Sequence, residues 1–250
     1  MNKKIKLYSG VTFLIGISAI CFGINLMVKS NFGVSVVSSI PYVYSLKFKN
    51  ITFGGWSYLI QTIPFILLVI LLKNLKVKYF LSFFMAYVLG KSIDIFGMIL
   101  PSFNSDTLMS RLTLFVAGTV AIAFGISAWI KSQYLMQPCD VFIKDFSKEK
   151  KINIGKTKTL FDLSCLSTSV VSSLFFLRKI EGVYLGTLLS ALTTGMMVKF
   201  FIDIQNKYIE DVNFFNKERI DLVLEYDFFQ MKKQLKKMFP VNSCQENQKL

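Results

Sequence analysis

The sequence predicts an all-α membrane protein with six transmembrane helices, arranged as two inverted-topology repeats of three helices each. Three observations predict this fold. Hydrophobic residues make up 53% of the chain and occur in blocks of about 20, the length that crosses the hydrocarbon core of a bilayer. Charged residues, 18% of the chain, gather in short loops and in a tail. The first half of the chain also recurs, in weakened form, in the second half.

The apolar blocks place six spans, in chain order at about 7–29, 54–72, 77–100, 110–131, 157–177 and 182–204. Lys3, Lys4 and Lys6 precede the first block, as lysines precede the core of a signal peptide. This apolar run is too long for a signal peptide, and no small-x-small cleavage site follows it, so we expect a retained helix.

Lysine and arginine are distributed unequally between the two sets of loops. Of 29 such residues, 22 flank the spans on the side of the N-terminus, 6 lie on the opposite side, and Lys91 falls within a span. Cytoplasmic loops of membrane proteins carry the excess of positive charge. The bias therefore predicts a multi-pass membrane protein with both termini in the cytoplasm.

An internal repeat relates the two halves. Residues 22–30, FGINLMVKS, are matched by residues 124–132, FGISAWIKS, and nine of twenty positions are identical at an offset of 102. Each repeat, about 7–100 and about 110–204, holds three spans, and because three is odd the two copies must cross the membrane in opposite senses. Inverted repeats are typical of secondary transporters, whose substrate site lies near the midplane between the repeats.

Composition argues against several other classes of protein. The chain has no histidine, so a His-based triad or a His metal site is impossible, and its four cysteines form no C-x-x-C pair. Nothing resembles a phosphate-binding or dinucleotide-binding glycine loop. We therefore expect neither an enzyme nor a resident metal or cofactor. The basic residues flank membrane spans, which explains the high pI without a nucleic-acid partner.

Small residues recur at helical spacing in the first and fourth spans. Gly16 and Gly23 lie seven residues apart on one helix face, and Gly118 and Gly125 repeat the arrangement. Small side chains let two membrane helices approach closely. We expect these spans to pack against each other or against a neighbour, and sliding between two states is the alternative.

Ionisable side chains within spans are costly and usually mark a partner or a pathway. Lys91 and Asp94 share one face of the third span. They are predicted to form either a structural ion pair or a gate in which Asp94 accepts a proton. Asp162, one turn into the fifth span, either pairs with Lys156 or Lys158 or faces a cavity. The predicted substrate pathway comprises Lys91, Asp94, Asp140, Asp162, Asn25 and Gln61.

Two segments after the first and fourth spans, residues 31–48 and 133–150, are long and partly apolar. Each is predicted to form a short helix that either lies in the interface or re-enters the membrane. Pro138 suits the first turn of such a helix, and Asp140 lies where a carboxylate favours the helix dipole. Asp140 is thus either a capping group or the lining of a polar cavity. Lys29 is expected, like its repeat partner, to stabilise a helix C-terminus.

Several residues carry a resemblance to a known family: the glycine-bearing first helix, Gln137-Pro138-Cys139-Asp140, Gly155 at the start of a span, and Leu185-Gly186-Thr187. Over residues 10–205 the chain resembles the YczE/YitT-type bacterial membrane proteins, and the resemblance implies their fold and a location in the bacterial cytoplasmic (inner) membrane. The Pro-aromatic-Asp pattern of that family has Cys139 at its middle position here, and the first repeat has Val36-Val37-Ser38 in its place.

The chain divides into a transmembrane domain, 1–205, and a cytoplasmic tail, 206–250, predicted to contain an amphipathic helix. The preferred function is a secondary transporter or permease for a small polar solute. The alternative is a membrane-embedded regulator or scaffold that acts through the tail. The expected partners are the lipid bilayer, an unknown small solute and a second copy or another protein bound by the tail.

Overall fold

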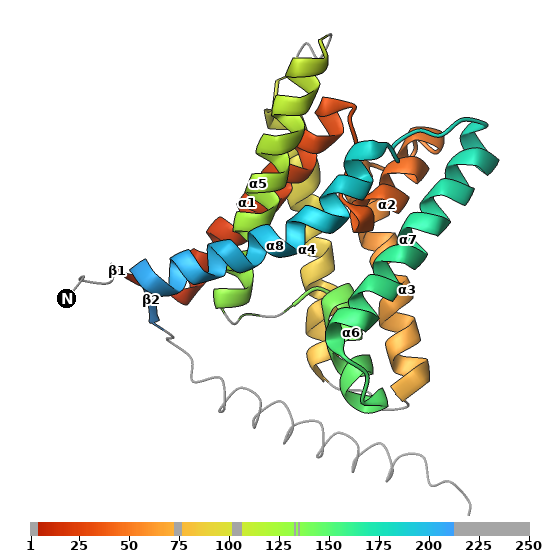
Figure 1. The fold of residues 1–250 in the computed structure, drawn as a ribbon. Helices are drawn as coiled ribbons and strands as arrows, with labels where there is room; N and C mark the ends of the chain where they lie inside the picture. Colours follow the sequence, from red (N-terminus) through yellow and green to blue (C-terminus); the bar gives the residue numbers. More distant parts are fainter. Residues whose placement is uncertain (1–4, 73–76, 102–106, 133, 135, 213–250) are drawn as a thin grey trace, which may run out of the picture.

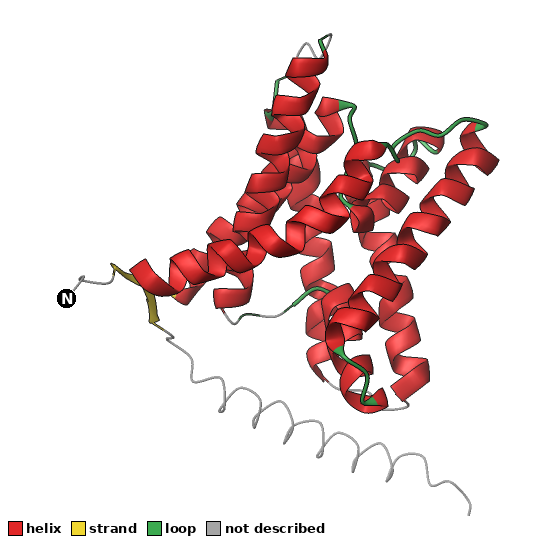
Figure 2. Ribbon diagram, viewed as in Figure 1, coloured by secondary structure: helices red, strands yellow, loops and turns green. Residues whose placement is uncertain are grey.

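The computed structural model describes residues 5–72, 77–101, 107–132, 134 and 136–212. These residues form eight helices and one short two-stranded sheet (Figures 1 and 2). In chain order the elements are β1 (Ile5–Tyr8), α1 (Ser9–Ser30), α2 (Val36–Lys47), α3 (Phe53–Leu72), α4 (Val77–Ile99), α5 (Leu108–Ser132), α6 (Pro138–Lys150), α7 (Ile154–Leu177), α8 (Leu185–Tyr208) and β2 (Ile209–Val212).

Six of the described helices, α1, α3, α4, α5, α7 and α8, are long and apolar enough to cross a membrane, which confirms the six predicted spans. The sixth begins at Leu185 and not at 182, because Tyr184 is extended and Gly182 has a φ of 77°. Apolar side chains cover the outward faces of these helices. The chain is therefore a multi-pass membrane protein whose helices contact lipid.

The two ends of the helical domain meet at one end of the molecule. Strand β1 pairs in parallel with β2, with Ile5 beside Ile209 and Tyr8 beside Val212. The start of α1 and the end of α8 therefore lie together, and we call this end the strand end (Figure 2). The sequence did not predict these strands. The amphipathic helix predicted in the tail lies outside the described residues.

Helices α1 and α5 form the centre of the fold. They cross antiparallel, with Gly16 beside Gly125 and Gly23 beside Gly118. Helix α4 packs on α1, and α8 packs on α5 (Figure 1). The main apolar core fills this crossing, and its buried members are Ile17, Ile20, Cys21, Ile24, Met27, Met85, Leu89, Ile93, Phe115, Ile122 and Trp129.

The other four helices form a ring beside this crossing. Helix α2 contacts α3 and α7, and α6 also contacts α3 and α7, so the two short helices lie between the same two long ones. We call α2, α3, α6 and α7 the four-helix ring. Helix α4 joins the ring to the crossing because it packs on α1, α3 and α6. Over their whole described lengths α7 and α8 make almost no contact, whereas α3 and α4 pack closely.

Candidate functional site

Helix α2 begins near the middle of α7 and ends at the end of the molecule opposite the strand end. Val36 and Ile40 pack against Cys165, which is halfway along α7. Phe48, just past the end of α2, packs on Phe176 at the end of α7, with ring centroids 5.5 Å apart. The helix therefore starts at the centre of the ring and runs outward. This is the geometry of a segment that enters the bundle and returns.

The chain before α2 reaches this depth in five residues, 31–35. Gly33 has a φ of 150°, and a Cβ there would lie 2.5 Å from the backbone nitrogen of Thr187. The hydroxyl of Thr187 accepts a hydrogen bond from the backbone of Val34 at 3.2 Å. The first turn of α8 therefore holds the segment in place, and only glycine fits at this close approach.

Helix α6 begins inside the ring, where Cys139 of its first turn interacts electrostatically with Cys165 of α7, and runs outward toward the start of α7. Val141, in the first turn of α6, packs with Leu68 and Tyr79, while the rings of Phe142 and Phe161 are tilted to each other with centroids 5.9 Å apart. Further along α6, Asp145 accepts a hydrogen bond of 2.8 Å from the hydroxyl of Tyr79, at the start of α4. Both short helices therefore begin inside the ring and end near opposite ends of the molecule. Sequence reasoning missed the Tyr79–Asp145 bond.

Gln61 lies on α3 between the places where α2 and α6 begin. Its neighbour Ile60 packs with the cluster around Val36, and Phe65 packs with the cluster around Val141. The Gln61 side chain is only 5% exposed, and its Oε1 has no hydrogen-bond partner among the described residues. A buried amide oxygen without a hydrogen-bond partner destabilises the folded protein. A hydrogen-bond donor bound at this point would therefore stabilise it.

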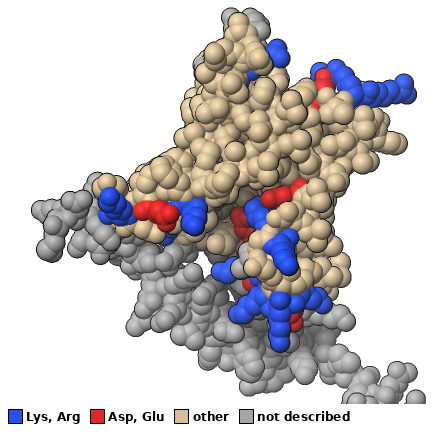
Figure 3. Space-filling model, in the orientation of Figure 1, with Lys and Arg blue, Asp and Glu red and all other residues tan. Residues whose placement is uncertain are grey.

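Asp140 and Asp162, two residues of the predicted pathway, lie in one network. Lys158 forms an ion pair of 3.2 Å with Asp162 on its own helix, and it also interacts electrostatically with Asp140 across the α6–α7 contact. Asp140 accepts a hydrogen bond of 3.1 Å from the amide of Gln137. We call Gln137, Asp140, Lys158 and Asp162 the charged network. Figure 3 shows acidic and basic side chains gathered over this part of the molecule.

Burial raises the pKa of Asp140 above its usual range, against the opposing effects of Lys158 and of the Gln137 hydrogen bond. Asp162 adds a smaller effect in the same direction as burial. Burial also raises the pKa of the neighbouring Cys139 thiol well above its usual value. The network therefore combines two carboxylates with one ammonium, in a position where a carboxylate is costly to ionise.

An aromatic cluster closes the ring at its other end. Tyr44, Phe48, Trp56 and Phe176 come from α2, the residue after it, α3 and α7, and their ring centroids lie 5.1–6.2 Å apart. The indole nitrogen of Trp56 donates a hydrogen bond to the carbonyl oxygen of Phe48 at 3.3 Å. The ring thus has aromatic side chains at one end and the charged network toward the strand end.

Lys91 and Asp94 lie apart from this site and do not pair with each other. The ammonium of Lys91 lies 5.8 Å from the ring centroid of Tyr87. The Asp94 carboxylate accepts hydrogen bonds from the Thr52 hydroxyl, at 2.6 Å, and from the backbone nitrogen of Gly54, at 2.8 Å. These donors stand at the start of α3, so Asp94 caps that helix from a neighbouring one.

Asp94→Ala is expected to lower the free energy of unfolding by about 1–2 kcal/mol, because loss of a helix N-cap costs this much. Asp94→Asn keeps an acceptor for Gly54 and should cost less. Thermal unfolding of the purified protein in detergent measures both. An Asp94→Ala protein as stable as the wild type would show that the cap contributes nothing, and would favour the predicted pathway role for this residue.

Asn25 is also a structural clamp in this conformation. Its side-chain nitrogen donates to the carbonyl oxygens of Cys21 and Ile93, both at 2.9 Å, and so joins α1 to α4. In α8, the side-chain nitrogen of Gln205 donates to the hydroxyl of Ser127 in α5 at 2.7 Å. Asn25 and Ser127 occupy equivalent positions in the two repeats. No sequence pattern indicated the hydrogen bond between Gln205 and Ser127.

Lys29 and Lys131 cap helices other than their own. The Lys29 ammonium donates to the carbonyl oxygens of Leu100 and Pro101, at the end of α4, at 2.6 and 2.9 Å. The Lys131 ammonium donates to those of Gln205 and Ile209, at the end of α8, at 2.6 and 2.8 Å. Both ammonium groups therefore bond carbonyl groups at a helix C-terminus, as expected. In each case the helix is a neighbour and not the one that carries the lysine.

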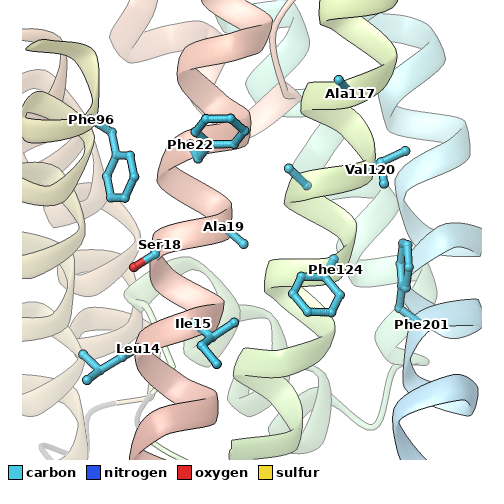
Figure 4. A pocket seen from close by; sticks show the side chains of 11 residues that line it. Leu14, Ile15, Ser18, Ala19, Phe22, Phe96, Ala117, Val120, Phe124 and Phe201 are labelled. Atoms are coloured by element: carbon cyan, nitrogen blue, oxygen red, sulfur yellow. The ribbon is translucent and has the colours of Figure 1, made fainter. Parts of the chain in front are cut away.

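A groove of about 870 Å³ lies on the surface of the crossing of α1 and α5 (Figure 4). Phe22 and Phe124 border it on the two central helices, and Phe96 and Phe201 border it on α4 and α8. Ser18 supplies its only polar side chain. The groove suits the acyl chain of a lipid, and it contains none of the predicted pathway residues.

Residues 7–203 match the family described as "Family of unknown function (DUF6198)". The chain is also similar to a protein of Bacillus subtilis (strain 168) named "Uncharacterized protein YyaS". The two are 27% identical over 206 residues, which cover 80% of this chain and 94% of that protein. No solved structure matches the chain. The resemblance to the YczE/YitT-type proteins stays a prediction.

Proposed function

From the premise that this chain belongs to the family of unknown function DUF6198, we propose that it is a secondary transporter or permease for a small polar solute. We place the solute between the starts of α2 and α6. One observation carries the proposal: two short helices begin near mid-depth between the same pair of long helices, α3 and α7. Interrupted helices that start near the midplane are the usual binding elements of secondary transporters.

We also propose that the two halves are inverted repeats. Equivalent residues make equivalent contacts: Ser30 and Ser132 both donate to a carbonyl three residues back, at 2.6 and 2.7 Å. Phe13 stacks on Tyr134 at 5.0 Å, while Phe115 packs on Phe32 at 5.3 Å. The repeat offset of 102 relates Phe13 to Phe115 and Phe32 to Tyr134, so the two aromatic pairs are equivalent. The matching Lys29 and Lys131 caps support the same relation.

The membrane orientation follows from charge. Lys and Arg gather over α6, the start of α7 and the end of α8 in Figure 3, toward the strand end. We therefore propose that the strand end faces the cytoplasm, in a bacterial inner membrane. In this orientation the charged network lies on the cytoplasmic side of the solute site, and the aromatic cluster lies on its external side. The protein is a transporter and not an enzyme in this proposal.

The test is a thermal-shift screen of the purified full chain in detergent against small metabolites and ions, followed by uptake of any binder into proteoliposomes. A ligand of the folded state raises the unfolding temperature in a saturable way. We expect at least one such ligand, with its shift lost in Asp140→Asn and kept in Asp203→Asn, an exposed aspartate of α8. A ligand whose uptake is unchanged in Asp140→Asn would contradict the site.

A truncated chain separates transport from a scaffold role. Because α8 continues to Tyr208 and β2 to Val212, the truncation must keep residue 212. A transporter lacking residues 213–250 should retain most of its uptake, since the ring and the crossing are intact. Loss of all uptake in a truncated protein that still folds would favour a function that depends on the tail.

A further inference from the structure

We propose that Asp140 binds the proton that couples this transporter to the membrane gradient, and that loss of this proton loosens the contact between α6 and α7 on the cytoplasmic side of the solute site. This inference rests on the proposed function. The step is proton binding alone: the Asp140 carboxylate takes a proton from water on the open side and becomes a neutral carboxylic acid. No other bond forms or breaks.

The first support is the position of Asp140. It lies in the first turn of α6, where that helix begins inside the ring, and it is close to Lys158 and Asp162 of α7. Gln61, whose Oε1 is buried without a described partner, lies one turn of α3 before Phe65, and Phe65 packs with the cluster around Val141 in the first turn of α6. A proton bound at Asp140 is therefore next to the place where a solute would bind.

The second support is the difference between the two aspartates. Asp162 is bonded to the Lys158 ammonium at 3.2 Å and so has its own counter-charge. The hydrogen bond described for Asp140 comes from Gln137, which is a neutral donor. When Asp140 loses its proton, the Lys158 ammonium is already paired with Asp162, and the attraction of Lys158 does not offset the burial of the new charge. The ionised carboxylate therefore favours entry of water between α6 and α7, whereas the protonated acid favours the closed contact.

The charged and titratable groups around Asp140 are few. Helix α3 contributes no charged side chain to the ring, and Tyr79 of α4 is bonded to Asp145. Cys139 and Cys165 are the other titratable groups close to the network, and burial makes the Cys139 thiol difficult to ionise. Burial disfavours the charged form of Asp140, whereas Lys158 and the Gln137 hydrogen bond favour it less strongly. Such a balance moves proton uptake toward the working pH.

The experiment measures how accessible Cys139 and Cys165 are to N-ethylmaleimide, in full-length protein with Cys21 and Cys244 replaced by serine. Both reporter thiols are buried in this structure. Labelling is followed from about pH 8 to about pH 4, and at each pH it is divided by the labelling of the denatured protein, because a thiol itself reacts faster as pH rises. This ratio reports the opening of the α6–α7 contact without any solute.

We expect the ratio to rise several-fold as pH rises in the parent protein. In Asp140→Asn, which mimics the protonated acid, it should be low at every pH, and in Asp203→Asn it should behave as in the parent. A flat ratio in the parent, or an equal rise in Asp140→Asn, would overturn the proposal. The assay needs no solute, so failure to find a transported solute would count against the proposed function and leave the proton site standing.

The pH dependence of unfolding is an independent check on folded protein. A carboxyl whose pKa is raised by folding stabilises the native state at low pH, and this stability is lost as pH rises through the folded-state pKa. Near neutral pH, Asp140→Asn should therefore unfold at a higher temperature than the parent. An Asp140→Asn protein that unfolds at a lower temperature at every pH would show that the charged carboxylate is a structural group and not a proton site.

Discussion

Gly23→Leu is expected to prevent the chain from accumulating as a folded membrane protein. A Cβ at Gly23 would lie 2.6 Å from the carbonyl oxygen of Gly118 and 2.9 Å from the backbone nitrogen of Ile122. Both atoms belong to backbone and cannot turn aside. A leucine adds three further carbons to that Cβ, so α1 and α5 would have to separate along the whole crossing.

The expected cost exceeds that of an ordinary core substitution. Overpacking a core costs about 1–3 kcal/mol when side chains can adjust, and more when backbones must move. In a bilayer, close packing is itself the main force between helices, because lipid tails are as apolar as the side chains. Gly125→Leu should have the same effect, since a Cβ there would lie 2.7 Å from the carbonyl oxygen of Gly16.

The measurement is the yield of monodisperse protein in detergent by size-exclusion chromatography, together with its unfolding temperature. Gly195→Leu in α8 is the matched control, because a Cβ at Gly195 has no atom within 4 Å. The control should behave as the wild type. If Gly23→Leu also gave normal yield and an unchanged unfolding temperature, the close crossing of α1 and α5 would be wrong.

Gln61→Met is expected to abolish transport while raising the unfolding temperature. Methionine has nearly the length of glutamine and no amide. The wild-type protein buries the Oε1 of Gln61 without a described partner, and an unsatisfied buried polar group costs about 1–3 kcal/mol. Removing it should therefore stabilise the empty protein. The same change removes a buried polar group of α3 that lies between the starts of α2 and α6, so solute binding should be lost.

Gln205→Met provides the matched control. Gln205 also buries an Oε1 without a described partner, but its side-chain nitrogen donates to Ser127, and it lies in α8 outside the four-helix ring. This variant loses a hydrogen bond, so it should not be stabilised, and it should keep its uptake. Thermal unfolding and proteoliposome uptake of the screened ligand measure both variants. A Gln61→Met protein with normal uptake would remove Gln61 from the site.

Much of the fold could be predicted because it depends on local patterns. A block of apolar residues must be helical to cross lipid, whatever its neighbours, so six spans follow from composition along the chain. Gly23 and Gly118 are visible as small residues at helical spacing, although only the structure brings them together. The short helices α2 and α6 were expected as helices, but nothing local distinguishes a segment in the interface from one that enters the bundle.

The candidate site was predicted only in part, because its chemistry depends on contacts between distant segments. Asp140 and Asp162 were expected on general grounds, since charges near spans are costly, and the structure places both around Lys158. The same reasoning selected Asp94, which the structure shows capping α3. A carboxylate that caps a helix and one that lines a pathway look alike in sequence.

The sequence by itself determined that six described helices of this protein are long and apolar enough to cross a membrane, because transfer of apolar helices into lipid depends on their own composition and length. The tertiary structure decided which polar groups find partners. Lys29 bonds the end of α4, 71 residues away in the chain, and the Oε1 of Gln61 has no partner among the described residues. Hydrogen bonding is directional and acts only at short range, so the partners of a buried polar group follow from packing and not from its place in the sequence.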